Sequence, residues 1–572
     1  MKQISITFFL SRGILALASL ISHPTIASDV NDHLNRNDSV RPHSLPAKQP
    51  GSFQLPVVAP TVSESVLNVQ ESETIEVQRI VFRGNSVISA VELEKVVAPY
   101  VGRALTAVDL EDLGLILTRY YVGHGYVNSG ATLATDAFND GTLTFDVVEG
   151  RLANIRLKGL DGLHESYLVG RLVTSPDKAL NIETLRERFV LLLNDPLFER
   201  INARLIPTSK DGEADLDMEV TRALPYTLSV FANNYRPPSI GTNGYGIGGS
   251  LRNLTGYGDQ LGANYQESSQ GGNSPRMSLD WNVPLNTVGT QVSLKLDHGQ
   301  SSVIEEPLQA LKIKSRINSH EIGLSQVLYE TLRHKFSAGI NWSNRKNSTE
   351  VLGQAFSFTA GESTGQININ ASRFWQEYAY RSDREVLALR STFTRAHNNL
   401  NDTAVFPPAT GGFLAENQYQ LWLGQAQYAR QLLDNSAQLI LRATQQQTEH
   451  VLTTLDRMSI GGISTVRGYL ENQLIRDRGT VINIEFDYPL HRSSGKGLNV
   501  SLIPFYDHGF GNNQHEAVNT VSSAGLNLRV RYQGLFLDFV IAKRLAHSND
   551  ISTEGSTLQA KGMHIQLGYE FY

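Results

Sequence analysis

The chain has 572 residues, a formal net charge of −6 and no cysteine. A chain of this length exceeds the usual size of one compact domain, so several domains or one very large architecture are expected. The acidic balance leaves no basic footprint for nucleic acid, and the absence of cysteine excludes disulfides, thiolate metal sites and cysteine nucleophiles. Such a composition is compatible with an extracytoplasmic protein.

Residues 1–27 carry the pattern of a secretory signal peptide. Lys2 and Arg12 flank the start of the apolar run GILALASLIS, and Thr25 and Ala27 stand as small residues before a cleavage point. The alternative is a transmembrane anchor, but this run of about ten residues is shorter than the roughly 20 that a helix needs to span hydrocarbon. The signal peptide predicts export. Since no other segment could span as a helix, any membrane domain must be built from strands.

Residues 28–74 have the composition of a periplasmic linker. Prolines recur among serine, asparagine and charged residues, at Pro42, Pro46, Pro50, Pro56 and Pro60. These are too many chain breakers, and too few apolar residues, for a packed core.

An ordered α+β segment is expected over residues 75–150. Alternation over Ile75–Phe82 predicts a strand, Ser89 followed by Glu92 predicts a helix start, and a second helix is predicted from Ala107. Two strands follow, one from about Tyr126 to Leu133 and one around residues 142–149. The predicted order is β-α-α-β-β.

The same order returns over residues 151–223, with two helical segments and a hairpin around residues 210–212. Two units of similar length form an internal repeat. The pair resembles tandem POTRA domains, the periplasmic modules of the Omp85 superfamily. Two unrelated small α+β domains are the alternative.

From residue 224 to residue 572 the helical period disappears and period-two alternation recurs in segments of about ten residues, which is typical of a transmembrane β-barrel. A soluble β-sandwich also alternates. The last strand favours the barrel, because Tyr569, Phe571 and Tyr572 place aromatic rings at its end. About 16 antiparallel strands are expected in this membrane β-barrel.

One segment of the barrel, residues 455–480, departs from alternation. Its sequence GGISTVRGY resembles the loop motif of the Omp85 superfamily through Val466, Arg467, Gly468 and Tyr469. With only two POTRA-like units, the chain resembles a TpsB outer-membrane transporter of two-partner secretion, the haemolysin and haemagglutinin exporters. That resemblance implies a hairpin folded back into the barrel lumen, and it leaves open whether residues 28–74 plug the pore.

The resemblance also implies a partner for the arginine. IPFYDHGFG is similar to the superfamily motif whose aspartate faces the lumen, here Asp507 with Phe505 and Gly509 in register. A carboxylate there can accept a bidentate guanidinium bond that lysine cannot reproduce. A second barrel signature is similar through Asn253, Gly256, Gly258 and Asp259.

Two segments depart from the family pattern. FANNYRPP stands where an aspartate and a glycine are usual, and Lys543 and Arg544 stand where an arginine and a proline are usual. These departures bear on partner specificity and leave the superfamily assignment unchanged.

Enzymatic patterns are weak. Ser363 in GESTG satisfies G-x-S-x-G, but an alternating segment follows where a nucleophile elbow needs a helix. His164, His320 and His515 precede glutamates without completing a zinc-protease motif, and no phosphate loop is recognisable. We expect no enzymatic activity, cofactor or metal.

The function predicted is outer-membrane export of a specific β-rich exoprotein of the TpsA type. Capture by an edge strand of the first POTRA unit is expected near Tyr126, Val127 and Leu133. Further expected partners are outer-membrane lipid and lipopolysaccharide, and the barrel assembly machinery during biogenesis. The alternatives are an Omp85-type assembly and insertion factor, which typically has more POTRA units, and a passive porin, which would not need residues 75–222.

Overall fold

The computed structural model describes residues 52–54 (backbone only), 74–173, 178–359, 362–400, 414–433, 436–493, 497–547 and 555–571. The predicted signal peptide, almost all of the predicted linker and Tyr572 lie outside these ranges. The chain divides into two compact units, one containing residues 46–223 and the other residues 224–572. Among the described residues, no helix combines the length and the apolarity needed to cross a membrane.

The first α+β domain begins with two short strands, β2 (Ile75–Val77) and β3 (Arg79–Arg83), followed by α3 (Ala90–Val97), the 3-10 turn η1 (Ala98–Tyr100) and β4 (Arg103–Leu105). Helix α4 (Ala107–Gly123) then leads to β5 (Gly130–Asn139) and β6 (Thr142–Val148). Ser89 and Thr106 each cap a helix reciprocally with the acidic residue three positions on. The short strands β2 and β4 pair with each other and were not predicted.

The sheet of this domain has the order β3-β6-β5, so β6 is central, as predicted, and β5 lies at an edge. However, β5 begins at Gly130, and Tyr126 and Val127 precede it, so the strand predicted from Tyr126 starts too early. The reason is a turn: the Tyr126 amide donates to the Tyr121 carbonyl, which caps the end of α4. Tyr126 packs against the core of its own domain, whereas Val127 packs against the core of the next.

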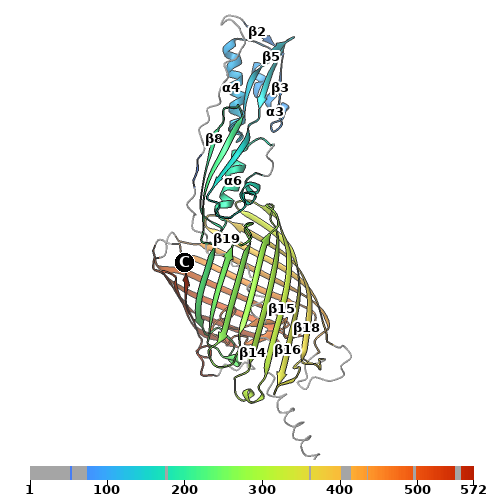
Figure 1. Cartoon of the computed structure of the whole chain (residues 1–572), viewed down its shortest axis with the longest axis vertical. Helices are drawn as coiled ribbons and strands as arrows, with labels where there is room; N and C mark the ends of the chain where they lie inside the picture. Colours follow the sequence, from blue (N-terminus) through green and yellow to red (C-terminus); the bar gives the residue numbers. More distant parts are fainter. Residues whose placement is uncertain are drawn as a thin grey trace, which may run out of the picture. The chain divides into compact units, whose positions relative to one another are not determined.

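The second α+β domain repeats the plan with β7 (Arg151–Lys158), α5 (Glu165–Leu172), α6 (Ile182–Leu193), β8 (Phe198–Pro207) and β9 (Glu213–Arg222). Its sheet has the order β1-β8-β9-β7, in which the three-residue strand β1 (Ser52–Gln54) runs parallel to β8. The helices cover one face of each sheet, and α4 and α6 mark the two domains in Figure 1.

The two α+β domains are joined by backbone contacts. The Ile182 amide at the start of α6 donates to the Gly125 carbonyl at 2.9 Å, and the Asn181 side chain donates to the His124 carbonyl at 3.0 Å. The Asn128 side chain donates to the Gly212 carbonyl at 2.9 Å. Together with Val127, these bonds seat the turn after α4 on the following domain.

The remaining unit is a closed antiparallel β-barrel, which confirms the predicted fold class, and its tilted strands run from green to red in Figure 1. Its described wall contains 16 strands: β10 (Tyr226–Asn233), β11 (Gly244–Arg252), β12 (Gln260–Ser268), β13 (Arg276–Pro284), β14 (Thr290–Ser302), β15 (Lys314–Glu330), β16 (His334–Val351), β18 (Gln366–Arg381), β19 (Glu385–Asn398), β20 (Gln418–Gln431), β21 (Gln438–Gln447), β24 (Arg478–Arg492), β25 (Asn499–Asn512), β26 (Asn519–Tyr532), β27 (Leu535–His547) and β28 (Met563–Phe571).

Pairing of β10 with β28 closes the barrel, in a register that sets Leu228 opposite Phe571 and Asn233 opposite Gln566. Closure leaves no unpaired sheet edge in lipid, where an unsatisfied backbone group is costly. Leu567, Tyr569 and Phe571 face outward and are about two-fifths to one-half exposed, while His564 on the other face is buried. The two-residue strand β17 (Gln354–Ala355) pairs with β16, and the 3-10 turns η2 (Pro238–Ile240) and η3 (Leu308–Leu311) lie between strands.

Candidate functional site

The connection between β21 and β24, residues 448–477, lies inside the barrel. It carries a small hairpin of its own, β22 (Met458–Ile460) paired with β23 (Leu474–Arg476). Most of its residues are buried, and an apolar cluster joins it to the wall through Ile460, Val466, Tyr469, Val481 and Val521. The loop ends at Asp477, because Arg478 opens the wall strand β24, three residues before the limit predicted for it.

Glycines shape the tip of this loop. Gly461, Gly462 and Gly468 have φ angles of 113°, 100° and 87°, a region that disfavours side chains. A Cβ on Gly462 would lie 2.1 Å from the Glu471 carboxylate, and one on Gly468 would lie 2.7 Å from the Cβ of Ala542. The tip therefore requires glycine both for its turn and for its close approach to the wall.

Arg467 at this tip is buried and forms a fork with Asp507 on β25. Its Nε donates to Oδ2 and its terminal nitrogen to Oδ1, each at 2.7 Å, and its backbone amide donates to Oδ2 at 3.0 Å. Asp507 has no exposed surface. A second terminal nitrogen of the guanidinium lies 2.8 Å from Glu485 on β24, and the Phe505 ring centroid lies 3.6 Å from Cζ.

The three predicted wall residues lie on one face of β25 and all serve the loop. Phe505 stacks under the guanidinium, Asp507 accepts its hydrogen bonds, and Gly509 leaves room for the loop, since a Cβ there would meet Ile460 at 2.6 Å and Val466 at 2.8 Å. Asn483 on β24 donates to Asp507 at 2.8 Å and to the Thr465 carbonyl at 2.5 Å.

Gly468 and Tyr469 attach the tip to the last strands. The Gly468 amide donates to Nε2 of His564 at 3.0 Å, and Nε of Arg544 donates to the Gly468 carbonyl at 2.7 Å. The Tyr469 hydroxyl donates to the Ala546 carbonyl at 2.6 Å. Arg544, which departs from the family pattern in sequence, is therefore a direct partner of the loop.

The comparisons with known proteins bear on this architecture. Residues 212–531, more than half of the chain, match the family described as haemolysin secretion/activation protein ShlB/FhaC/HecB. The chain belongs to this haemolysin secretion/activation family. Residues 75–150 match the POTRA domain of ShlB type.

Relatives of this family span nearly the whole chain. The heme/hemopexin transporter protein HuxB of Haemophilus influenzae (strain 86-028NP) is 23% identical over 544 residues, which cover 94% of this chain and 92% of HuxB. The structure of CdiB from Escherichia coli aligns with a TM-score of 0.68 at 20% identity and covers 90% of this chain and 94% of its own. CdiB from Acinetobacter baumannii aligns with a TM-score of 0.61 at 16% identity, covering 91% and 95%. Such structural matches support the fold, and the family places the barrel in the outer membrane.

The base of the loop has an anchor in this family member that the sequence analysis missed. Asp456 forms an ion pair with Arg345 of β16 at 3.1 Å and accepts the Tyr419 hydroxyl of β20, and both charged side chains are about 95% buried. Arg345 also donates to the Leu455 carbonyl at 2.9 Å. Leu452 and Leu455 pack beside it on Ile317 and Ile369.

The end of the loop is held in the same way. Asp477 is fully buried and accepts Nε of Arg457 at 2.8 Å, the Leu452 amide at 3.0 Å and the Gln514 amide at 3.1 Å. Arg345, Asp456 and Asp477 belong to no recognised motif, and their surroundings in the sequence, the polar run SNRKNST, the pair Asp456–Arg457 and the triplet RDR, give no signal of burial.

The other predicted residues have separate places. Asn253, Gly256, Gly258 and Asp259 build the turn between β11 and β12, where buried Asp259 accepts the Thr255 amide at 2.8 Å and the Trp281 indole at 2.8 Å. Gly258 donates to the Asn253 side chain at 2.9 Å. Tyr569 and Phe571 lie on the outer face of β28, and Leu133 lies in the edge strand β5.

Proposed function

We propose that this chain exports a specific β-rich exoprotein of the TpsA type through its barrel, by two-partner secretion. Membership of the haemolysin secretion/activation family supports the reaction class. The observation that carries the proposal is the lumenal loop, since it occupies the pore and is held there by the ion pairs of Arg467 and Asp456. A pore whose obstruction is fastened by discrete contacts can be opened by an event that breaks them.

Capture of the exoprotein is assigned to the periplasmic POTRA domains, residues 75–150 and 151–223. In the first domain β5 lies at an edge of the described sheet, so its outer backbone groups are available to an extended peptide. Leu133 lies on this edge, whereas Tyr126 and Val127 flank it and position the turn before it. In the second domain the outer edge of β8 is already paired with β1. Backbone pairing at β5 gives affinity with little demand on sequence.

The outward direction of transport is assigned to folding of the exoprotein. The sequence contains no recognisable phosphate loop, so folding of the exported chain outside the cell supplies the driving force in this proposal. Outer-membrane lipid is assigned to the outer face of the barrel wall. Insertion of the barrel is assigned to the assembly machinery of the outer membrane.

HuxB is named a heme/hemopexin transporter and CdiB an outer membrane transporter. An Omp85-type assembly factor shares the architecture, but the family match favours export. A passive porin would need neither POTRA domain.

The decisive experiment deletes the gene for this chain and measures secretion of a large protein encoded beside it. We expect that protein to remain in the periplasm and to return to the medium when the full chain is restored. Normal secretion by the deletion strain would refute export. A matched chain lacking residues 75–149 should form a barrel but bind no exoprotein in a pull-down, and retention of binding would refute capture by the first POTRA domain.

A further inference from the structure

The outer face of the barrel carries cations toward the extracellular ends of β15, β16 and β19. Arg316 on β15 and Lys346 on β16 are diagonal neighbours, because Arg316 lies opposite Ser348 and Lys346 opposite Asn318. Both are exposed and share the strand face of the lipid-exposed residues Ile322 and Trp342. Arg395 on β19, exposed beside Phe393, adds a third cation to this side of the wall. We call these three residues the outer cation cluster.

The outer cation cluster differs from the arginines inside the barrel. Arg276, Arg345 and Arg373 face the lumen, and each forms an ion pair of 3.0 or 3.1 Å with a carboxylate. By contrast, the three outer cations form no ion pair with any acidic residue that the structure describes. Glu350 is the one acidic residue on the outward faces of the extracellular halves of β14–β20, and it lies opposite Lys314. The cluster therefore presents net positive charge outward.

Its height on the wall corresponds to lipid headgroups. Arg316 lies six positions beyond Ile322, which is about 15 Å along the membrane normal for a strand rising about 3.3 Å per residue and tilted by about 40°. Lys346 lies four positions beyond Trp342, a ring type that favours the membrane interface. Arg316 and Lys346 thus stand just outside the apolar band, on the extracellular side, and Arg395 lies in register with Trp342 through Ser372.

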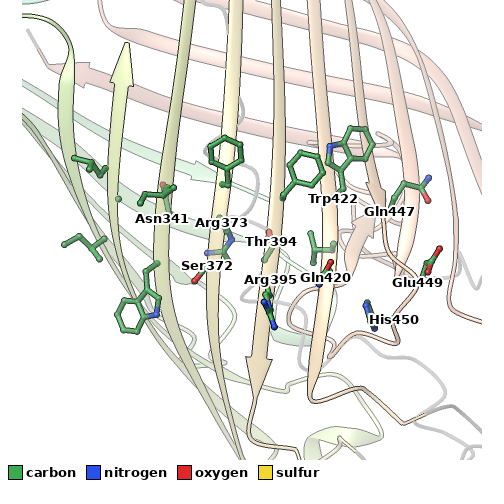
Figure 2. A pocket seen from close by; sticks show the side chains of 18 of the residues that line it. Asn341, Ser372, Arg373, Thr394, Arg395, Gln420, Trp422, Gln447, Glu449 and His450 are labelled. Atoms are coloured by element: carbon green, nitrogen blue, oxygen red, sulfur yellow. The ribbon is translucent and has the colours of Figure 1, made fainter. Parts of the chain in front are cut away.

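Directly beside the cluster lies an apolar groove of about 980 Å³. Its wall contains Trp342, Phe374, Phe393 and Trp422, and its polar end contains Arg395, Gln420, Gln447, Glu449 and His450. Figure 2 shows Arg395, Gln420 and His450 at a similar level in the view, below Trp422. A groove lined by rings, with a cation where it meets the headgroup level, matches an amphiphile with acyl chains and an anionic head.

We propose that this face, β14–β20 with the outer cation cluster and the groove, is a binding site for the phosphorylated glycolipid of the outer leaflet, lipopolysaccharide. Its phosphates would meet Arg316, Lys346 and Arg395, and an acyl chain would lie in the groove. Charge complementarity selects this lipid class, because a strongly anionic head satisfies cations that form no ion pair with a described carboxylate, although Glu449 lies at the same end of the groove as Arg395.

The opposite side of the barrel supports the assignment to one site. There the outward cations at the extracellular ends are separated, with Arg478 on β24 bonded to Asn512 and Lys543 on β27 beside apolar Leu545. On β12, the outward residue Glu267 accepts bonds from Tyr245 and Tyr265. A general requirement for outer-leaflet contact would distribute cations around the whole barrel.

The test uses the full-length protein purified in detergent and titrated with purified lipopolysaccharide, with bound lipid counted by native mass spectrometry. Arg316→Gln combined with Lys346→Gln should weaken binding by about tenfold or more, from the contribution of a Lys or Arg near an anionic surface. Arg478→Gln combined with Lys543→Gln removes the same charge from the other side and should leave binding unchanged. Lipopolysaccharide stripped of its phosphates should bind the wild type as weakly as the double variant binds the intact lipid.

Three results would overturn the proposal. They are equal binding by the Arg316/Lys346 variant, equal weakening by the control pair, and undiminished binding of the phosphate-free lipid. Phosphatidylglycerol vesicles serve as a further arm, and binding as tight as that of lipopolysaccharide would show a general anionic surface instead. Secretion is measured separately: if the Arg316/Lys346 variant lost exoprotein binding while keeping its lipid, the face would belong to the exported chain. Normal secretion by the deletion strain would refute export but would not bear on this lipid site, and loss of the lipid site would leave export standing, so the two proposals fail independently.

Discussion

Arg467 and Asp507, which are 40 positions apart in sequence, meet through two side-chain hydrogen bonds of 2.7 Å and one backbone bond of 3.0 Å. The backbone amide and the guanidinium of one residue thus converge on a single carboxylate. Asp507 therefore fixes both the position of the loop backbone at Arg467 and the direction of the Arg467 side chain. Since both groups are buried, the pair gains little net stability from its charges, but breaking it by truncation of one partner costs about 3–5 kcal/mol.

The first prediction concerns the fork. Arg467→Lys keeps the charge but cannot span both carboxylate oxygens, so it should reduce secretion almost as far as Arg467→Ala. Both variants should still form a heat-modifiable barrel in the outer membrane. Secreted exoprotein in the medium is the measurement. Arg529→Lys, a lumen-facing arginine paired only with wall carboxylates, is the control and should secrete normally. Normal secretion by Arg467→Lys would show that charge alone suffices.

The second prediction concerns the anchor at the base of the loop. Asp456→Ala leaves Arg345 buried without its carboxylate and should destabilise the loop by about 3–5 kcal/mol, seen as more frequent pore openings in planar bilayers. The apolar double variant Arg345→Met with Asp456→Leu should recover part of this loss. With the single variants Arg345→Met and Asp456→Leu this double variant completes a double-mutant cycle, in which we expect a coupling energy of about 1–3 kcal/mol. A coupling near zero would mean that the two residues act independently.

The third prediction separates backbone strain from contact at the loop tip. Gly468→Ala combines a φ of 87° with an approach of 2.7 Å to Ala542, whereas Gly353→Ala has a φ of 80° and no atom within 4 Å. Both variants incur the strain of a left-handed backbone, about 1–2 kcal/mol. Only Gly468→Ala should also displace the tip, which is measurable as faster amide exchange at residues 466–469. Exchange at residues 466–469 in Gly468→Ala no faster than in Gly353→Ala would show that the contact with Ala542 does not displace the tip.

The fourth prediction concerns acid. Burial of Glu149 opposes its charged form, but hydrogen bonds from the Ser86 hydroxyl, the Ser86 and Val87 amides and the Tyr121 hydroxyl outweigh burial and lower the pKa of Glu149. A lowered folded-state pKa contributes stability that is present above the unfolded value of about 4.3 and is lost as the pH falls through the folded value. Protection of the Ser86 and Val87 amides from exchange in the full chain should therefore decline below about pH 4.3.

Glu149→Gln provides the control for this acid effect. The amide retains the shape of the side chain but does not titrate, so the variant should lose protection at neutral pH and show a flatter dependence below about pH 4.3. An unchanged acid profile in the variant would assign the decline to other carboxylates.

The sequence predicted the class of this fold because its evidence was local and repeated. Alternation along the wall strands, the two capping boxes and the repeat of about 75 residues each depend on near neighbours. The fork of Arg467 could be proposed only through the family motif, which pairs two distant segments. The anchor of Asp456 lacked such a motif, and a single acid before an arginine gives no sign of Arg345, which is 111 positions away.

The start of β5 was placed too early for a related reason. Tyr126 and Val127 look like strand residues, but one packs on its own domain and the other on the next, so tertiary packing outweighed the local preference. Likewise, Leu421 packs toward the lumenal cluster while Trp422 faces outward, an assignment that composition could not decide.

The pairing of β10 with β28 also has a consequence for the cargo. A β-rich polypeptide in transit meets a described wall whose strands already have partners on both sides, so this wall offers no free strand edge with which it could pair. Nucleation of its own fold is therefore deferred until it has left the pore. The closed barrel therefore keeps the exported chain extended while it crosses the membrane, and the chain forms its own β-sheet hydrogen bonds only after it has left the pore.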